Sequence, residues 1–522
     1  RVGVATSIQP LLELLPRRTL NMEHLTEFLV LPGLCIQETP GDSCAFEGVR
    51  RVGAGSAIVA RAGRTVETRV LWSWEARAVD PGTDSVEELG AQYRELLQAA
   101  VRERVHGRTA SHFSGGMDST ALALIADEHL RATGGEPLHA LSLVYERLSG
   151  LARERPYLEA ALQAHPQIVA HRIPGDDLLD YDSLEAPPPH EEPWSWLPRI
   201  AAERVMLDLA AEAGIETLFT GVGADELLDV PPYHIAEELR RGRPRAAWRE
   251  ASRKAAAHTC GVWTILYEYG LVPLLPPALR SGPRAWLHGG RVDWNGQNNY
   301  TIPPWVRPDF AQRHQMSERV LANFRRVFSG HGPAAFSVAV SSIAARHGDL
   351  SRRYLAAERG VHIAHPFFDQ RLAALMLGAQ LRLRPEPGVR KPVLAEATRG
   401  LLPEEIRTRR IKGHFGEACY LGLARNLPRL EALVRSAPVE DLDLIDKREL
   451  LECLRSAAMG VPTRFGIEAI ARLNLTLSLL KWLSMQEQWL RKAPAPAETR
   501  ALGSRLPGAA ANGRRESAAC SL

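Results

Sequence analysis

Two glycine-rich loops carry the residues of this sequence that are best suited to chemistry. The first loop, SGGMDS at 114–119, lies between a short apolar run and a helical pattern. Gly115 and Gly116 would let the backbone approach a polyphosphate closely, and the start of the helix would add N–H donors. The hydroxyls of Ser114 and Ser119 are further donors. The loop therefore predicts an anion cradle, and an ordinary glycine-rich turn with a capping serine is the alternative.

One acid lies inside this loop, where a carboxylate would repel phosphate groups. Mg²⁺ commonly joins one or two carboxylates to phosphate oxygens, so Asp118 is a candidate metal ligand. The loop has neither the G-x-x-x-x-G-K-[ST] spacing of a P-loop nor the G-x-G-x-x-G spacing of a dinucleotide fold. Those two modes of phosphate binding are therefore excluded.

A second loop, TGVGADE at 220–226, follows another apolar strand pattern. In a parallel sheet both loops would emerge at the carboxyl edge of the strands, where ligands of such sheets bind. Asp225 of the second loop could then share Mg²⁺ with Asp118. A glycine-rich turn with an acid at the start of a helix is the alternative.

The elements that must position these loops follow an α/β pattern. From about residue 105, short apolar runs alternate with amphipathic helical patterns, as in a domain built on a parallel sheet. The chain from 235 to about 492 is predicted to be mostly helical. The predicted strands lie directly before Ser114 and at 137–145, 167–173 and 216–221, and the predicted helices between them lie at 119–132, 153–164 and 199–213.

The sequence divides into three segments. Residues 1–85 are predicted to form a small β-containing domain, because apolar and polar residues alternate there around turn signals. A Pro-Gly-Thr-Asp-Ser stretch then precedes the second segment, 86–492, with Asp84 or Ser85 as the cap of its first helix. Residues 493–522, rich in Ala, Pro, Gly and Ser, are predicted to be a disordered tail.

Composition excludes several classes of protein. The chain has 64 Lys and Arg against 61 Asp and Glu, so its net charge of +3 provides no broad field for nucleic acid or an anionic membrane. It has no long apolar run and no signal-peptide pattern at its start, so the cytoplasm is the expected compartment. The six cysteines form no CxxC pair, which favours reduced thiols over disulfides or a zinc site.

The two loops belong to a longer series of motifs. Together with HPFFD at 365–369, Glu192-Pro193 and the stretch at 390–415, they resemble the synthetase domain of the asparagine synthetase family. The resemblance covers roughly residues 86–485. It implies an α/β fold: a small β-rich glutaminase-like domain, then a parallel-sheet synthetase domain of the ATP-pyrophosphatase type with a large helical C-terminal part.

The resemblance also implies which residues bind the nucleotide. The first loop would bind the pyrophosphate of ATP, and Asp118 and Asp225 would hold Mg²⁺. Val144, at the end of a predicted strand, and Gly221 and Gly223 of the second loop are further candidate nucleotide-binding positions.

A lysine of the stretch at 390–415 would, by the same resemblance, stabilise the adenylate and the leaving pyrophosphate. Such a lysine supplies a point charge where negative charge develops in the transition state. Lys412 is the first candidate and Lys391 the second. The alternative for either residue is a solvated cation on a surface helix.

The group that deprotonates the attacking amine is left open. At the position of Val222, asparagine synthetases tend to carry Glu and β-lactam-forming relatives Tyr, groups linked to handling that amine. Valine cannot transfer a proton. Glu226, Glu192 and His365 are candidates, each with a structural role as the alternative.

Within the family the chain looks most like the lasso peptide macrolactam synthetases, which join the N-terminal amine of a peptide to an Asp or Glu side chain. The cues are PPWVRPDFAQRH at 303–314 and the degenerate N-terminal domain. This subgroup works with a precursor peptide, a leader-binding protein and a leader peptidase. The family's glutaminase needs a cysteine at the first residue; here that residue is Arg1 and the nearest cysteine is Cys35, so no glutaminase activity is expected.

Two alternatives stay open at this point. One is another amide ligase of the same family that makes asparagine, a β-lactam or another small amide. The other is an inactive scaffold that binds nucleotide without turnover, against which the intact loops argue.

Overall fold

The computed structural model of the chain describes most of its length. The described residues are 3–31, 39, 41–61, 66–74, 76–229, 232–258, 261–275, 302–328, 334–344, 350–380, 382–384, 389–409, 413, 416–440, 442–460 and 467–486. Lys412 and the predicted tail at 493–522 lie outside these ranges.

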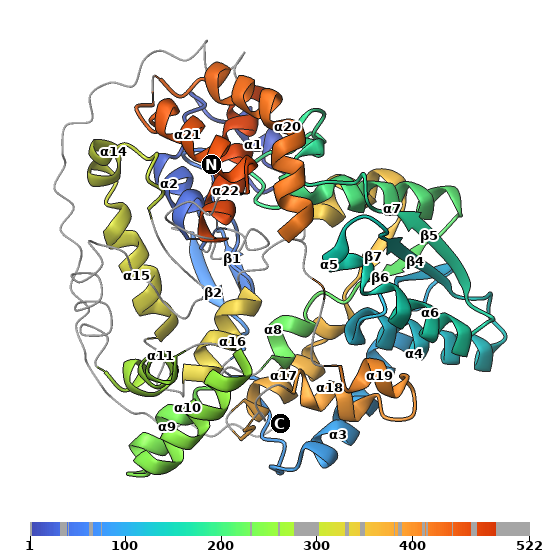
Figure 1. The fold of residues 1–522 in the computed structure, drawn as a ribbon. Coiled ribbons are helices and arrows are strands. Elements are labelled where there is room, and N and C mark those ends of the chain that lie inside the picture. The colour runs from blue at the N-terminus through green and yellow to red at the C-terminus, as the bar shows by residue number, and fades with distance from the viewer. Residues whose placement is uncertain are drawn as a thin grey trace.

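A parallel sheet of five strands forms the α/β part of the molecule (Figure 1). The strands lie in the order β5-β4-β3-β6-β7. Their bounds are β3 (Thr109–His112), β4 (His139–Val144), β5 (Val169–Pro174), β6 (Thr217–Phe219) and β7 (His362–Ala364). The predicted parallel sheet is thus confirmed. β6 pairs directly with β3, so the two glycine-rich loops leave neighbouring strands at the same edge.

Helices make up most of the rest, as predicted for the second half of the chain. Their bounds in the synthetase segment are α3 (Val86–Arg102), α4 (Met117–Thr133), α5 (Ser149–Ala152), α6 (Arg155–Ala164), α7 (Ile200–Glu212), α8 (Ala224–Leu228), α9 (His234–Arg240), α10 (Pro244–His258), α11 (Val262–Ile265), α14 (Pro308–Arg313), α15 (Met316–Phe328), α16 (Ala334–Ala344), α17 (Gln370–Ala379), α18 (Pro392–Ala397), α19 (Glu404–Arg407), α20 (Gly416–Ser436), α21 (Lys447–Ala458) and α22 (Ile467–Met485).

The sheet separates two hydrophobic cores. Leu218 and Ile363 belong to a core that includes residues of α7, whereas Phe219 and Ala364, the next residues along each strand, belong to a core with α3 and α4. Successive side chains of a strand point to opposite faces, so both faces of this sheet are covered by apolar side chains. Continuous burial on both faces fixes the strands and hence the loops that follow them.

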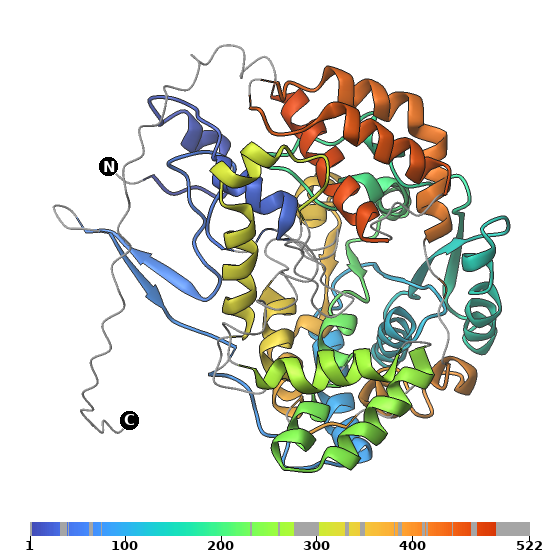
Figure 2. The same ribbon diagram turned by 60° about the vertical axis from the view of Figure 1, so that its left-hand side comes forward.

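The N-terminal segment contains a hairpin and two helices. β1 (Ser56–Val59) pairs antiparallel with β2 (Glu67–Val70), and Figure 2 shows this hairpin extending away from the neighbouring helices. The helices α1 (Gln9–Leu12) and α2 (Met22–Val30) were not anticipated in a β-rich segment. Asn21 caps α2, because its side-chain oxygen accepts the backbone N–H groups of Glu23 and His24 at 3.1 and 3.3 Å.

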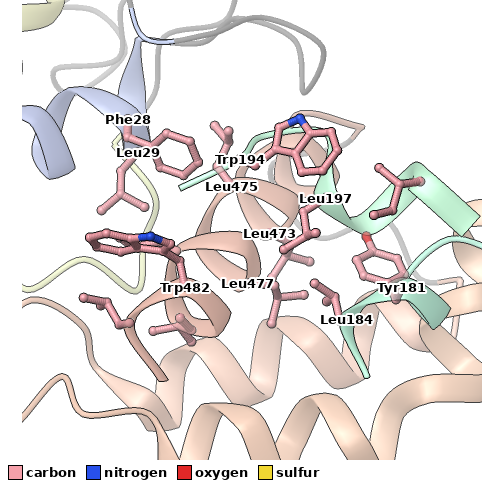
Figure 3. Close-up of a cluster of buried hydrophobic side chains, with 14 of the residues drawn as sticks. Phe28, Leu29, Tyr181, Leu184, Trp194, Leu197, Leu473, Leu475, Leu477 and Trp482 are labelled. Carbon is pink, nitrogen blue, oxygen red and sulfur yellow. The ribbon is translucent and has the colours of Figure 1, made fainter. Parts of the chain in front are cut away.

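The apolar face of α2 packs into the same core as the C-terminal helix α22. Phe28 and Leu29 lie in one cluster with Trp482 and Leu475 of α22 and with Leu197 (Figure 3). Burial of this cluster joins the N-terminal segment to the end of the described chain. Whether residues 1–85 form a glutaminase-like domain stays a prediction.

Among the described residues, Cys44, Cys419 and Cys453 are free thiols. Among the helices that the structure describes, none combines the length and the apolar character that crossing a bilayer requires.

Candidate active site

The first glycine-rich loop is shaped by close backbone contact. Gly115 has φ +73°, and a Cβ there would lie 2.5 Å from the backbone nitrogen of Leu158 in α6. No side chain fits into that space, and only glycine adopts this backbone conformation without strain. The loop therefore bends tightly against α6 before α4 begins, with Gly116 as the N-cap residue of α4.

The two serines of the loop bond to each other across the turn. The hydroxyl of Ser119 accepts the backbone N–H of Ser114 at 3.2 Å and lies 3.0 Å from the Ser114 hydroxyl. The Ser114 hydroxyl in turn accepts the backbone N–H of Gly116 at 3.2 Å. This arrangement holds the loop at the start of a 17-residue helix, where the first N–H groups have no partner within the helix. Such a helix start attracts an anion.

The second loop packs directly onto the first. A Cβ on Gly221 would lie 3.1 Å from the Cβ of Asp118, so glycine at this position allows the two loops to touch. Gly223 has φ +102°, which again favours glycine, and it precedes α8. Asp225 lies in the first turn of α8. Asp118 occupies the corresponding part of α4, so both acids come from helix starts at one sheet edge.

Lys391 joins these two acids. Its ammonium lies 2.6 Å from the Oδ2 of Asp118 and 2.6 Å from the Oδ1 of Asp225. The lysine side chain is 4% exposed, that of Asp118 15% and that of Asp225 59%. Two carboxylates from separate loops thus converge on one positive charge beside the anion cradle.

The backbone around Lys391 explains how the side chain reaches this point. Lys391 is the N-cap residue of α18 and has φ +44° and ψ +57°, a left-handed conformation that is uncommon outside glycine. α18 packs on α3 at Gly90, where a Cβ would lie 2.7 Å from the Cβ of Glu396. The missing side chain of Gly90 lets α18 approach α3, which in turn places Lys391 over the two loops.

Lys391, Asp118 and Asp225 form a trio with one positive and two negative side chains. Burial acts to lower the pKa of Lys391, but the carboxylates of Asp118 and Asp225 outweigh it and raise that pKa above the usual lysine value. Lys391 therefore carries a positive charge at neutral pH. One ammonium cannot neutralise two carboxylates, so the trio keeps a net negative charge that a metal ion would offset.

The donors present fit Mg²⁺. Both carboxylates already share one cation, and Mg²⁺ is usually bound through one or two carboxylates together with substrate phosphates and waters. Within the described ranges no group of three or more His, Cys, Asp and Glu side chains is arranged to hold a metal ion. A site made by Asp118, Asp225 and the phosphates of ATP requires only the two.

One further acid near the trio was missed from the sequence. Asp229 lies at the end of α8 and pairs with Arg390 at 3.8 Å. Partial burial raises the pKa of Asp229, an effect that Lys391 opposes and that Asp225 reinforces. No sequence signal distinguishes Asp229 from any other acid at the end of a short helix.

The remaining nucleotide candidate, Val144, ends β4, and its carbonyl accepts the backbone N–H of Gly175 at 2.8 Å. β4 adjoins β3, so Val144 lies at the same edge as the first loop.

The three candidate bases lie in different surroundings. Glu226 accepts the backbone N–H of Gly223 at 3.1 Å, as a helix-capping acid does. His365 follows β7, and its Nδ1 lies 2.6 Å from the hydroxyl of Thr220 at the start of the second loop. The backbone N–H of Val222 donates to that same hydroxyl at 3.4 Å. Glu226 and His365 thus both contact the loop of Val222.

Glu192 lies with the N-terminal segment. It accepts the backbone N–H of Ala45 at 2.8 Å and pairs with Arg51 at 2.5 Å. The imidazole of His24 lies 3.7 Å from it, and burial lowers the pKa of that histidine to about 4. The contacts of Glu192 therefore anchor the N-terminal segment to the synthetase part.

In the stretch at 303–314, Trp305, Val306 and Phe310 are buried in the core, whereas residues 307–309 are exposed. Trp305 is fully buried, and its indole N–H donates to the hydroxyl of Thr476 in α22 at 3.0 Å. Trp305 therefore has a packing role that does not depend on the substrate.

Comparison with known proteins shows which family this sequence matches. The family model described as asparagine synthase matches residues 92–491. Asparagine synthetase [glutamine-hydrolyzing] 3 of Bacillus subtilis (strain 168) is 30% identical over 116 residues, which are 22% of this chain and 18% of that protein. The match thus spans less than a fifth of the length of that relative.

A solved structure, the U34-tRNA thiolase NcsA from Methanococcus maripaludis with its [4Fe-4S] cluster, is 15% identical with a TM-score of 0.20. The match covers 50% of this chain and 82% of that one, and so low a score carries no argument. The family match, in contrast, covers the sheet, both loops and Lys391. The chain belongs to the asparagine synthase family.

Proposed function

We propose that the chain is an ATP-dependent, AMP-forming amide ligase, and that it closes a macrolactam ring in a precursor peptide. The observation that carries the ligase part is the convergence of Asp118 and Asp225 on Lys391 beside the first loop. This cluster combines an anion cradle, two acids suited to Mg²⁺ and a buried cation. Activation of a carboxylate with ATP needs these three features.

In the proposed reaction a carboxylate oxygen of the substrate attacks the α-phosphorus of ATP. The bond between the α-phosphorus and the bridging oxygen breaks, and pyrophosphate leaves. The amine nitrogen then attacks the acyl carbon, AMP leaves with the former carboxylate oxygen, and the amine loses a proton. The first loop would hold the pyrophosphate, and Lys391 and Lys412 would offset its charge.

Asp118 and Asp225 would hold Mg²⁺, which supplies charge neutralisation at the phosphates when bound. The cytoplasm, where ATP and Mg²⁺ are abundant, remains the expected compartment.

The peptide substrate is the finer part of the proposal. Its support is the resemblance of 303–314 to the macrolactam synthetases, and Val222, where β-lactam-forming relatives tend to carry Tyr, weakens the β-lactam alternative. In this reading the precursor peptide is delivered with a leader-binding protein and a leader peptidase. The alternative is a family ligase that makes asparagine or a β-lactam from a small acid.

The test compares two sets of substrates with the purified chain and Mg·ATP. One set is any short peptide encoded beside the gene for this chain, with a leader-binding protein and a leader peptidase, and the other is aspartate with ammonia. We expect AMP and pyrophosphate in equal amounts with the peptide only, and a peptide product lighter by one water. Product from aspartate alone would favour the small-molecule alternative. ADP as the stoichiometric product would exclude both ligase readings.

A further inference from the structure

A half-buried acid outside the proposed metal site links the first loop to the segment that precedes α20. Glu154 is the N-cap residue of α6. Its carboxylate accepts two N–H groups from the guanidinium of Arg409, one of them at 2.7 Å, and the backbone N–H of Gly413 at 2.5 Å. One carboxylate therefore holds two residues that lie about 255 positions further along the chain.

The contact is too enclosed for an ordinary surface ion pair. The side chains of Arg409 and Glu154 are 11% and 18% exposed. The guanidinium carbon of Arg409 also lies 4.0 Å from the centre of the Tyr157 ring, a cation–π contact. Bidentate, partly buried pairs of this kind fix geometry as well as charge, because both partners lose rotational freedom.

Further contacts fasten the same two segments. Glu417 accepts the hydroxyl of Ser149 at 3.3 Å and the backbone N–H of Gly150 at 3.2 Å. A Cβ on Gly413 would lie 2.6 Å from the Oε1 of Glu154 and 2.7 Å from the carbonyl oxygen of Gly150. Each segment thus contributes an acid that binds the other: Glu154 binds Arg409 and Gly413, and Glu417 binds Ser149 and Gly150. Gly413 lies too close to Glu154 and to the Gly150 carbonyl for any side chain to fit.

The same helix contacts the first loop. Tyr157 and Leu158, in the first turn of α6, form the backbone surface against which Gly115 packs. The N-terminal end of α6 therefore contacts both the proposed pyrophosphate loop and, through Glu154 and Tyr157, Arg409 and Gly413. Lys412, the proposed catalytic lysine, is the residue before Gly413 in the sequence.

We propose that Glu154 is a positioning residue, which sets the distance between the pyrophosphate loop and the chain at Arg409 and Gly413. This inference rests on the proposed function, because it assigns the segment a role in the ligase reaction. A shift of about 1 Å in a group that acts at the reacting centre can lower the rate by roughly a hundredfold. The nucleotide would still bind, since the first loop itself is unchanged.

Two variants disturb the contact by different means. Glu154→Gln keeps an acceptor for the Gly413 N–H and removes the charge that binds Arg409, whereas Gly413→Ala introduces a side chain where there is no space. Each should lower kcat by about tenfold or more while the KM for Mg·ATP changes by less than about twofold. Glu154→Ala, which removes the acceptor as well, should lose more than Glu154→Gln.

A matched control lies on the same helix. Glu159 pairs with the exposed Arg172 at 2.7 Å, away from Arg409, so Glu159→Gln should keep the kcat of the unchanged protein. Hydrogen–deuterium exchange of the peptide spanning 405–417 gives a readout that needs no substrate. Its exchange should be faster in Glu154→Gln and unchanged in Glu159→Gln.

The outcomes separate this inference from the proposed function. If the unchanged protein makes no AMP with any carboxylate, the proposed function fails, and the exchange experiment still decides whether Glu154 holds the segment. If the unchanged protein makes AMP and Glu154→Gln matches its kcat, the positioning role is overturned while the ligase stands. Equal exchange of 405–417 in Glu154→Gln and in the unchanged protein also overturns it.

Discussion

Replacing Lys391 with methionine is expected to lower turnover at saturating Mg·ATP by about a hundredfold or more, the range seen when one donor to a developing negative charge is deleted. Methionine keeps most of the buried stem but removes the ammonium that contacts Asp118 and Asp225. The two acids then repel each other and the incoming phosphates. The measurement is the rate of pyrophosphate release in the coupling assay.

A second readout distinguishes Lys391 from the other candidate lysine. Because its ammonium competes with a metal for the two acids, Lys391→Met should bind Mg²⁺ more tightly in the absence of nucleotide. Lys412→Ala should also lose about a hundredfold in turnover, with Lys412→Arg restoring part of it, but its Mg²⁺ affinity should not change. Lys481→Met, at a lysine of α22 that contacts the Glu185 carbonyl, provides the control for loss of a lysine charge.

The results would also rank the two lysines. Turnover near that of the unchanged protein in Lys391→Met, with the loss confined to Lys412→Ala, would leave Lys391 a purely structural ion-pair partner. The opposite pattern would show that Lys412 is not the family's catalytic lysine. Thermal unfolding of each variant confirms that a lost activity is not a lost fold.

Substitution of the two acids is expected to have an effect of similar size. Asp118→Asn and Asp225→Asn should each lower turnover by roughly a hundredfold or more, because each removes a charge that holds the same Mg²⁺. Since one ion is shared, the second substitution should add little to the first. The free-energy losses are obtained from kcat/KM of the single and double variants.

The same experiment contains its controls. Asp229→Asn removes a neighbouring acid that pairs with Arg390 and should retain most of the activity. In the unchanged protein, ATP binding should be lost in excess chelator. A metal shared by Asp118 and Asp225 would be contradicted if the free-energy loss of the double variant equalled the sum of the two single losses. Full-strength ATP binding without a divalent cation would contradict it as well.

The sheet and its two loops could be predicted because their determinants are local. Gly115, Gly221 and Gly223 lie where the backbone turns or approaches another segment too closely for a side chain, and such positions are visible as glycine clusters after apolar runs. The strand periodicity then places both loops at one edge. Ser85 could likewise be predicted as a helix cap, and it accepts the backbone N–H of Glu88 at 3.2 Å.

The sequence alone could not show that Lys391, the second of the two candidate lysines, contacts Asp118 and Asp225. Lys391 lies 273 residues from Asp118, and its reach depends on a left-handed backbone and on the packing of α18 against Gly90. None of these is visible in the local pattern around Lys391, which reads equally well as a solvated surface residue. Glu154 was missed for the same reason, since its partners Arg409 and Gly413 are distant in the chain.

Helices α1 and α2 show the same limit in the N-terminal segment. The alternation of apolar and polar residues predicted β structure in this segment, but the helix at Met22–Val30 is stabilised by tertiary burial of its apolar face against α22. Packing against a helix more than 440 residues away cannot be read from a local pattern, as the bond from Arg472 to the Leu29 carbonyl illustrates.

The central claim is that a substrate carboxylate is activated as an acyl adenylate. The most direct measurement uses a substrate whose carboxylate oxygens carry a heavy isotope, followed by mass analysis of the nucleotide product. The account predicts that AMP acquires one labelled oxygen for each amide bond formed, because the carboxylate oxygen that attacks the α-phosphorus leaves with AMP. Unlabelled AMP, or label found in inorganic phosphate together with ADP, would contradict it.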